Sequence, residues 1–284
     1  ALYYHPAGIV DAGSSILFDA SWVNFSSEYT RKALLRQVDP NTGRTVGRYR
    51  QTFAPVDGTT PVLPIPTLAG AFAIHPDFVI ALGAYAPYAA MTSYPDSVDG
   101  GAAPQRYSLY TLDGSALAVI GLWGAWAPID QLRVGAGFNL MTGSFRSTLD
   151  FSGGLPDRFF CSNENPVWDV GGEVAVGPIL APSANAGVIW EAIPGWRVGA
   201  SFQGPFIIDA PAPLRTRLPQ APPFDEAEVV GDQARVSFDL PWNLRLGVET
   251  RALVPDLRLE VAFNYARWSL HDPINAATDG IYLA

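Results

Sequence analysis

The stretch "PIDQLRVGAGFNLMTG" (Pro128–Gly143) decides the fold class. Its residues fall into two alternating sets, one apolar and one made of polar residues and glycine. The apolar set is Leu132, Val134, Ala136, Phe138 and Leu140, and the other is Arg133, Gly135, Gly137 and Asn139. Because successive side chains of a strand point to opposite faces, the pattern predicts a strand with one oily face. The second face carries a charge, an amide and two glycines, so it is not an ordinary water-exposed surface.

The same alternation accompanies other short turns. The turns are "HPD" (His75–Asp77), "PID" (Pro128–Asp130), "PG" (Pro194–Gly195) and "PD" (Pro255–Asp256). They recur roughly 50–65 residues apart, close to two membrane-spanning strands plus one long loop. The alternation is clean around the last three turns and blurred after the first.

Long connections with little periodicity separate these strand pairs. They are Ser26–Pro66, Thr92–Gln105, about Ser147–Asp169 and about Asp209–Gln233. Short turns at one end and long loops at the other are typical of outer-membrane barrels. A soluble sandwich usually has short loops at both ends.

The composition supports a membrane location. Hydrophobic residues make up 48% of the chain and charged residues only 16%, with a mean hydropathy of +0.12, whereas soluble domains carry roughly 25% charged residues. The most apolar continuous run, Ala116–Ile129, is too short and too rich in Gly and Trp for a spanning helix. The sequence therefore predicts an all-β fold, a transmembrane antiparallel β-barrel of the outer-membrane type.

Tryptophans are expected to form two girdles about one bilayer apart. Trp126 and Trp196 lie beside short turns, and Trp22, Trp242 and Trp268 lie near the opposite strand ends. The alternative is that these residues fill a soluble core.

Charged residues on the inward parity predict a polar, wet or ion-paired lumen. They are Arg133, Arg197, Arg245, Glu249, Arg258 and Glu260. Burying such groups in an apolar core without partners would cost several kcal/mol each. Arg133 and Arg197 are candidates to bind a substrate carboxylate, but the favoured interpretation is that they pair with Glu and Asp across the lumen.

Several function classes lack support in the sequence. The net charge of −9 argues against nucleic-acid binding. The single cysteine, Cys161, is expected to be an inert loop residue. The three histidines, His5, His75 and His271, are scattered, and no zinc, phosphate-loop or dinucleotide motif occurs. We therefore expect no enzymatic activity, no catalytic residue, no metal site and no cofactor.

The first residues, "ALYYHPAG" (Ala1–Gly8), resemble the "YYNPAG" motif of the FadL/OmpP1/TodX outer-membrane transport family, with His5 in place of the usual Asn. Further segments resemble the family in the same order: "IALGAYAPY" (Ile80–Tyr88), Gln105–Phe138, "FDLPWNLRLGV" (Phe238–Val248) and "VAFNYARWSLHD" (Val261–Asp272). The resemblance covers most of the chain.

The resemblance implies a bacterial outer-membrane barrel of 14 strands that carries hydrophobic compounds, such as long-chain fatty acids or aromatic hydrocarbons, by passive transport. It implies a hatch in residues 1–13, including Tyr4, His5, Pro6 and Ala7, and a barrel in residues 14–284. It also implies lateral release at a kink in the third strand, for which Gly83 and Pro87 are the candidates; the alternative is that Pro87 marks the end of a strand. Leu155, Phe159 and Phe160 are candidates to line an outer substrate groove; the alternative is that the two phenylalanines pack the loop onto the rim of the barrel. The expected partners are a hydrophobic substrate, outer-membrane lipid and lipopolysaccharide.

The sequence shows about nine strands, and its end, "DGIYLA", lacks a terminal aromatic residue. Because an open sheet edge is not stable in lipid, we expect the sequence to be part of a longer chain. Two alternatives remain open: an outer-membrane barrel with a structural or adhesive role, and a soluble, secreted all-β protein.

Overall fold

The computed structural model describes residues 2–39, 41–42, 44–60, 64–87, 92–108, 111–152, 164–253, 257–270 and 274–284. In this part of the chain the fold is all-β, with short 3-10 helices. None of the helices there is long and apolar enough to cross a membrane.

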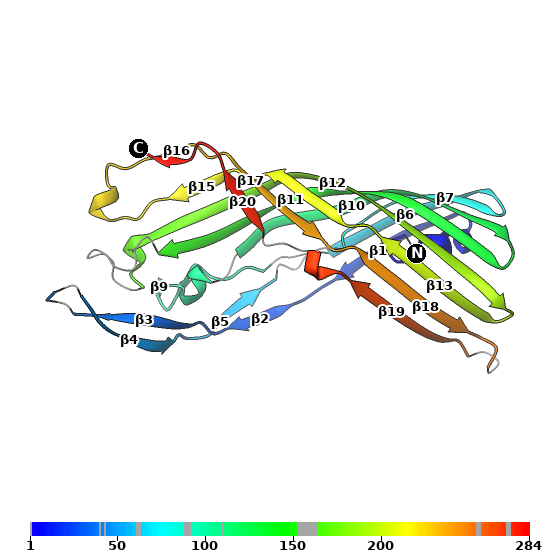
Figure 1. Ribbon diagram of the computed structural model, residues 1–284, viewed down its shortest axis with the longest axis horizontal. Coiled ribbons are helices and arrows are strands. Elements are labelled where there is room, and N and C mark those ends of the chain that lie inside the picture. Colours follow the sequence, from blue (N-terminus) through cyan, green and yellow to red (C-terminus); the bar gives the residue numbers. More distant parts are fainter. Residues whose placement is uncertain are drawn as a thin grey trace.

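One large antiparallel sheet dominates the molecule (Figure 1). Nine strands of the described chain follow one another along it, in chain order. They are β1 (Ser15–Trp22), β6 (Pro64–His75), β7 (Phe78–Tyr85), β10 (Thr111–Ile129), β11 (Leu132–Ser152), β12 (Asp169–Ile193), β13 (Trp196–Gln203), β18 (Asn243–Thr250) and β19 (Leu259–Ala266). A tenth strand, β15 (Leu214–Arg217), pairs with the first residues of β12, from Gly171 to Val174.

Tight turns join neighbouring strands at one end of the sheet, on the right in Figure 1. Two residues connect β6 to β7, β10 to β11 and β12 to β13, as the short turns predict. The connection from β18 to β19 is longer and includes residues 254–256, which lie outside the described residues. We call this end the turn end and the opposite end the loop end.

The predicted alternation of faces is present in β11. Its register pairs Phe138 with Ala184 and Asn139 with Ser183 on β12. Phe138 is 57% exposed on the outer face, whereas Asn139 is fully buried on the inner face. The opening stretch of sequence therefore forms the two-faced strand that its pattern predicts.

The outer face of the sheet is a broad apolar surface. Exposed side chains on it are Ile120, Leu122, Trp126, Phe138, Val188, Trp190, Val198, Phe202, Leu246, Val248, Val261 and Phe263. Soluble monomers rarely expose contiguous apolar patches larger than a few hundred Å². Leu246 is 44% exposed and Val261 76% exposed, so neither is sandwiched between two stacked layers.

The central strands are longer than a membrane requires. β12 has 25 residues, which at about 3.3 Å per residue extends roughly 80 Å. A tilted strand crosses the apolar band of an outer membrane in about 9–11 residues. The loop-end halves of β10, β11 and β12 therefore extend beyond the span that the membrane needs.

The long connections contain strands that the sequence pattern did not reveal. Ser26–Pro66 was expected to be irregular, yet it contains two hairpin-like ribbons. They are β2 (Ser26–Tyr29) with β5 (Val56–Thr59), and β3 (Lys32–Val38) with β4 (Thr45–Thr52). Similar short pairs are β8 (Ser97–Val98) with β9 (Gly101–Ala102), and β16 (Val229–Val230) with β21 (Tyr282–Leu283). These ribbons are too short, or bury too little of one face, for alternation to be visible.

A small sheet extends β13 and β18 toward the loop end, where its first strand lies beside β12. It contains β14 (Phe206–Pro211), β17 (Ala234–Leu240) and β20 (Asn275–Thr278). Gly204–Pro205 separates β13 from β14, because proline cannot donate a ladder hydrogen bond. Phe206, Ile208 and Ala210 alternate toward the inside and join the buried apolar core with β10, β11 and β12.

Candidate functional site: hatch and lumen

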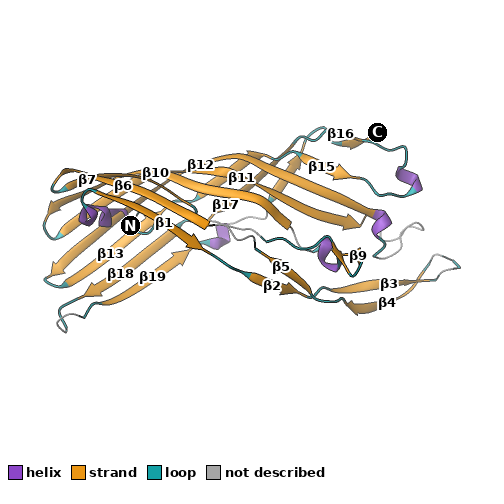
Figure 2. Cartoon of the chain, turned by 180° about the vertical axis from the view of Figure 1, so that it is seen from behind, coloured by secondary structure: helices purple, strands orange, loops and turns teal. Residues whose placement is uncertain are grey.

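The N-terminal segment lies against the inner face of the sheet, near the turn end. Its 3-10 helix, η1 (Pro6–Ala12), contacts β7, β10, β11 and β12. Pro6 begins the helix, where its fixed φ suits helical geometry, and Gly13 ends it at a positive φ of 55°. Figure 2 shows η1 beside the N-terminus, within the curve of the sheet. We call residues 2–13 the hatch segment.

Glycines of the wall make room for the hatch segment. A Cβ added at Gly135 would lie 2.5 Å from the Ala7 nitrogen, and one at Gly187 would lie 2.9 Å from His5 Cε1. A Cβ at Gly83 would lie 2.6 Å from Leu2 Cδ1. The inward glycines of three strands thus leave a recess that the hatch segment occupies, and we call this recess the hatch seat. The side chain of any larger residue at these positions would occupy the same space.

Side chains of the wall donate hydrogen bonds to the hatch backbone. Asn185 Nδ2 donates to the Leu2 carbonyl at 3.0 Å, and Ser201 Oγ donates to the Tyr4 carbonyl at 2.6 Å. Arg245 Nη1 donates to the Tyr3 carbonyl at 3.2 Å. These contacts hold a segment of irregular backbone whose carbonyls would otherwise lack partners.

Aromatic rings surround the first residues of the hatch segment. The Arg245 guanidinium lies 4.7 Å from the centre of the Tyr3 ring and 5.2 Å from that of Tyr4, in cation–π range. Tyr3 meets Tyr85 edge-on at 5.5 Å. Trp123 lies behind Tyr85 and donates from Nε1 to Asn185 Oδ1 at 3.1 Å. Arg245 is therefore the wall residue that combines charge, hydrogen bonding and ring contact with the hatch.

The hatch residues named by sequence have different environments. Tyr4 is 65% exposed, whereas Pro6 and Ala7 are buried. The His5 ring lies beside Gly187 and Gly199. Burial lowers the pKa of His5, because a charged imidazole is poorly solvated there. Neither ring nitrogen makes a hydrogen bond in the described structure, although the nearby carbonyls of Val188 and Ala200 oppose the lowering of the pKa.

The two candidates for a lateral opening lie at different places. Gly83 is inside β7 and accommodates Leu2, so in this structure it is part of the hatch seat. Pro87 lies two residues beyond the end of β7. The pairing of β7 with β10 stops at Tyr85 and Val119, while β10 itself begins at Thr111. The first residues of β10 therefore lie beyond the described pairing of β7.

The inward charges near the hatch are paired. Arg133 Nε lies 2.7 Å from Asp11 Oδ1, and Arg197 Nε lies 3.1 Å from Glu191 Oε2. Arg258 pairs with Glu249 at 3.0 Å and with Glu260 at 2.8 Å. A charged recess of about 660 Å³ lies among these groups, the hatch and Arg245. This geometry favours the ion-paired lumen over carboxylate binding by Arg133 and Arg197.

Toward the loop end the interior becomes apolar. Buried side chains there are Val119, Met141, Val176, Ile179, Ala181, Phe206, Ile208, Ala210, Val236 and Leu240. Phe145 and Phe238 meet edge-on at 6.2 Å beside this cluster. We call this set the apolar interior.

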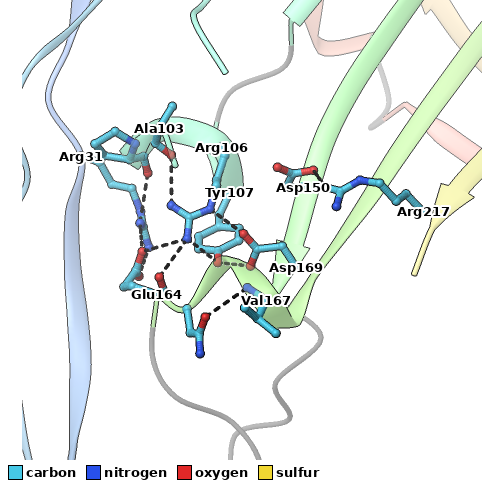
Figure 3. Close-up of polar contacts among 11 residues, drawn as sticks. Arg31, Ala103, Arg106, Tyr107, Asp150, Glu164, Val167, Asp169 and Arg217 are labelled. Carbon is cyan, nitrogen blue, oxygen red and sulfur yellow. Dashed lines mark hydrogen bonds and ion pairs between the residues drawn. The ribbon is translucent and has the colours of Figure 1, made fainter. Parts of the chain in front are cut away.

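A buried ion-pair network ties the loop end together (Figure 3). Arg31 makes two hydrogen bonds to Glu164, at 2.7 and 2.8 Å. Arg106 Nε binds Asp169 Oδ2 at 2.7 Å, and Tyr107 donates to the other Asp169 oxygen. Burial, together with the Asp169 carboxylate, raises the pKa of Tyr107 above its usual range. The network joins four segments at the loop end. They are Arg31, which precedes β3, η2 (Pro104–Tyr107), the residues just before η3 (Pro166–Trp168), and the start of β12.

The predicted outer groove cannot be placed. Leu155, Phe159 and Phe160 lie outside the described residues. Glu164, close to the end of that connection, is anchored by Arg31.

Trp123, Asn185 and Ser201 were not predicted as site residues, and Arg245 was predicted only as a lumen charge. A usable signal existed, since Asn185 and Ser201 have the inward parity and lie two residues from the inward glycines Gly187 and Gly199. Glycines and small polar residues at one level of adjacent strands indicate a buried backbone segment.

In the described residues, no group of three or more His, Cys, Asp or Glu side chains is arranged to hold a metal ion.

The fold is therefore of the outer-membrane β-barrel class: all-β, one long antiparallel sheet, apolar outside and polar at its turn end within. Among solved structures, the chain is similar to the Ralstonia pickettii toluene transporter TbuX, with a TM-score of 0.55 and 15% sequence identity. The match covers 97% of this chain and 69% of that chain. At this identity the likeness shows the fold alone. No family model matches the chain, and no curated protein matches it.

Proposed function

We propose that this chain forms a passive channel of the FadL/OmpP1/TodX type, which carries hydrophobic small molecules across the bacterial outer membrane. The observation that carries the proposal is the junction of two zones inside one sheet. An apolar interior occupies the loop-end half, and it meets a seated hatch segment at Tyr3, Tyr85 and Trp123. Long-chain fatty acids and aromatic hydrocarbons are the two substrate classes that such an interior suits.

The first step of transport is desolvation. A hydrophobic molecule gains about 25 cal/mol for each Å² of apolar surface that leaves water. The apolar interior offers that environment, and its side chains contact one another closely. A substrate that enters therefore separates side chains that contact one another, rather than displacing water. The groove of Leu155, Phe159 and Phe160 is proposed to collect the substrate first.

The second step is passage of the hatch. The two parts of the hatch are held differently: Ala7 and Ile9 are buried against the wall, whereas the carbonyls of residues 2–4 are held by single hydrogen bonds from wall side chains. Such hydrogen bonds are individually modest, at about 0.5–1.5 kcal/mol net each, so residues 2–4, which depend on them, are the part of the hatch best suited to movement. We propose lateral release near Pro87, where β7 has ended and β10 continues.

Uptake by matched variants tests the proposal. Ala181 is fully buried inside β12, and Ala184 is exposed on the outer face of the same strand. We expect Ala181→Phe to lower the uptake of both palmitate and toluene several-fold in proteoliposomes, and Ala184→Phe to leave it unchanged. Heat-modified mobility in gels checks that both variants are folded. Equal uptake with and without the wild-type protein contradicts the proposal.

A structural or adhesive barrel is the second candidate. It is favoured by the close packing of the apolar interior. Wild-type protein that inserts into membranes but leaves uptake unchanged would select this candidate.

A further inference from the structure

The β3–β4 hairpin projects at the loop end of the molecule, far from the hatch (Figure 1). In Figure 2 the same hairpin extends beyond β2 and β5, away from the large sheet. Six of the 18 Lys and Arg residues of the chain lie between residues 31 and 50, where Asp39 is the one acidic residue. The whole chain, in contrast, has a net charge of −9. We call β3–β4 the cationic hairpin.

The register of the cationic hairpin places its charges on one face. Leu34 lies opposite Arg50, and Arg36 lies opposite Arg48. Lys32 shares this face, because it is two residues before Leu34. The face therefore carries Lys32, Arg36, Arg48 and Arg50. Over the five residues from Lys32 to Arg36 the charges extend roughly 13 Å along the ribbon.

Cations that share one face of a two-stranded ribbon repel one another. Side chains directly opposite in an antiparallel pair have Cβ atoms about 4.5–5.5 Å apart, and like charges there are destabilising. The Asp39 carboxylate accepts hydrogen bonds from Asn41 N and Thr42 Oγ1 in the hairpin turn. Arg31 is paired with Glu164. No acidic side chain of the described residues pairs with Lys32, Arg48 or Arg50.

The chemistry of the face indicates a ligand with several phosphates. Guanidinium groups bind phosphate oxygens through two parallel hydrogen bonds, and they are preferred for this role over lysine. One carboxylate head group would occupy a single arginine, whereas this face presents four cations along its length. An exposed leucine, Leu34, lies among the charges. A polyanion with apolar parts fits both features.

We propose that the cationic hairpin binds the phosphate groups of lipopolysaccharide, the glycolipid of the outer leaflet. The inference rests on the outer-membrane location in the proposed function, and it adds a partner and a surface to it. The hairpin belongs to the loop end, which in that location faces the cell exterior. Phosphates bound along Lys32, Arg48 and Arg50 would supply the negative charge that no acidic side chain of the described residues supplies there.

The test measures binding of detergent-solubilised protein to immobilised lipopolysaccharide, with a dephosphorylated sample as the second surface. The variant is Lys32→Gln, Arg48→Gln, Arg50→Gln. The matched control, Arg215→Gln, Arg235→Gln, Arg251→Gln, removes three exposed charges elsewhere. We expect the hairpin variant to bind at least about tenfold more weakly with a shallower salt dependence, and the control to match wild type.

Equal wild-type binding to both surfaces overturns the inference, as does full binding by the hairpin variant. Free inorganic phosphate that competes as well as lipopolysaccharide would show an isolated anion site and also overturn it. A hairpin variant that loses palmitate uptake but keeps lipopolysaccharide binding would assign the face to substrate capture instead. The binding assay does not depend on transport. A wild-type protein that shows no uptake can therefore still confirm or contradict the binding of lipopolysaccharide by the cationic hairpin.

Discussion

Gly135 shows how one residue can decide whether the hatch segment is seated. A methyl group there would lie 2.5 Å from the Ala7 nitrogen and 2.6 Å from the Pro6 carbonyl carbon. Both are backbone atoms, so no side-chain rotation relieves the clash. We expect Gly135→Ala to displace the hatch and increase the permeability of liposomes to small solutes.

The control for this prediction is Gly124→Ala on the neighbouring strand β10. A Cβ at Gly124 would come no closer than 3.9 Å to the Phe78 ring, so the hatch is unaffected and permeability stays at the wild-type level. Unchanged permeability in Gly135→Ala would contradict the steric account of the seat.

His5 makes hatch seating dependent on pH. Burial lowers its pKa below the ordinary 6.5 in the seated hatch, whereas a released hatch regains the ordinary value. As the pH falls through about 6.5, protons therefore bind preferentially to the released state, and seating weakens. Above that pH the seated state keeps its full stability. Hydrogen exchange of residues 2–12 between pH 7.5 and 5.5 measures the change.

The variant for this test is His5→Asn. The substitution removes the imidazole that binds the proton. Hydrogen exchange of residues 2–12 in this variant should then change with pH only as the exchange rate of an unprotected amide does. Asp11 and Arg133 form the charge pair nearest along the hatch, and the variant leaves this pair in place. The same pH dependence in His5→Asn would exclude His5 as its source.

At the scale of elements, the ion-pair network holds the loop end to the start of β12. The Asp169 side chain is 3% exposed and that of Arg106 is 9% exposed. Removing one partner of such a pair costs about 3 kcal/mol, since the other charge stays buried. We expect Asp169→Asn to make η2 and the residues around Glu164 sensitive to protease while the large sheet remains folded.

Arg217→Gln is the comparison, because Arg217 is 57% exposed and lies 3.7 Å from Asp150. An exposed pair contributes at most about 1 kcal/mol, so protease sensitivity should not change. Equal resistance of Asp169→Asn and wild type would show that the network does not hold these segments.

The predictability of each element follows from its burial. β11 was predictable, because one face is apolar and the other meets a hatch, which imposes strict alternation on Phe138 and Asn139. β3 and β4 were not, since a projecting ribbon has few constraints on which side chains alternate. The ion-pair partner of Arg31, Glu164, lies more than a hundred residues away, so no local pattern signals it.

The hatch seat shows the same division. The inward position of the glycines was visible in the sequence. Which backbone lies against these glycines, and that Ser201 and Asn185 bind its carbonyls, depends on how four strands are placed side by side. The roles of Leu155, Phe159 and Phe160 stay predictions.

At the scale of the whole molecule, the account depends on what contacts the outer face. Its apolar side chains come from strands far apart in sequence and lie together because the register of the sheet aligns them. A charged side chain at the middle of that face would cost about 2–4 kcal/mol in a bilayer. In water the same change would be nearly neutral at an exposed position.

The most direct measurement places spin labels on the outer face in lipid bilayers, in a Cys161→Ser background. The labelled positions are Leu122, Phe138, Leu246 and Val261, with Gln131 in a short turn as the reference. The account predicts that the four outer positions collide more often with oxygen, which concentrates in lipid, than with a water-soluble nickel complex. Gln131 should show the reverse. Four outer positions that collide mainly with the nickel complex would contradict the membrane-facing sheet on which the account depends.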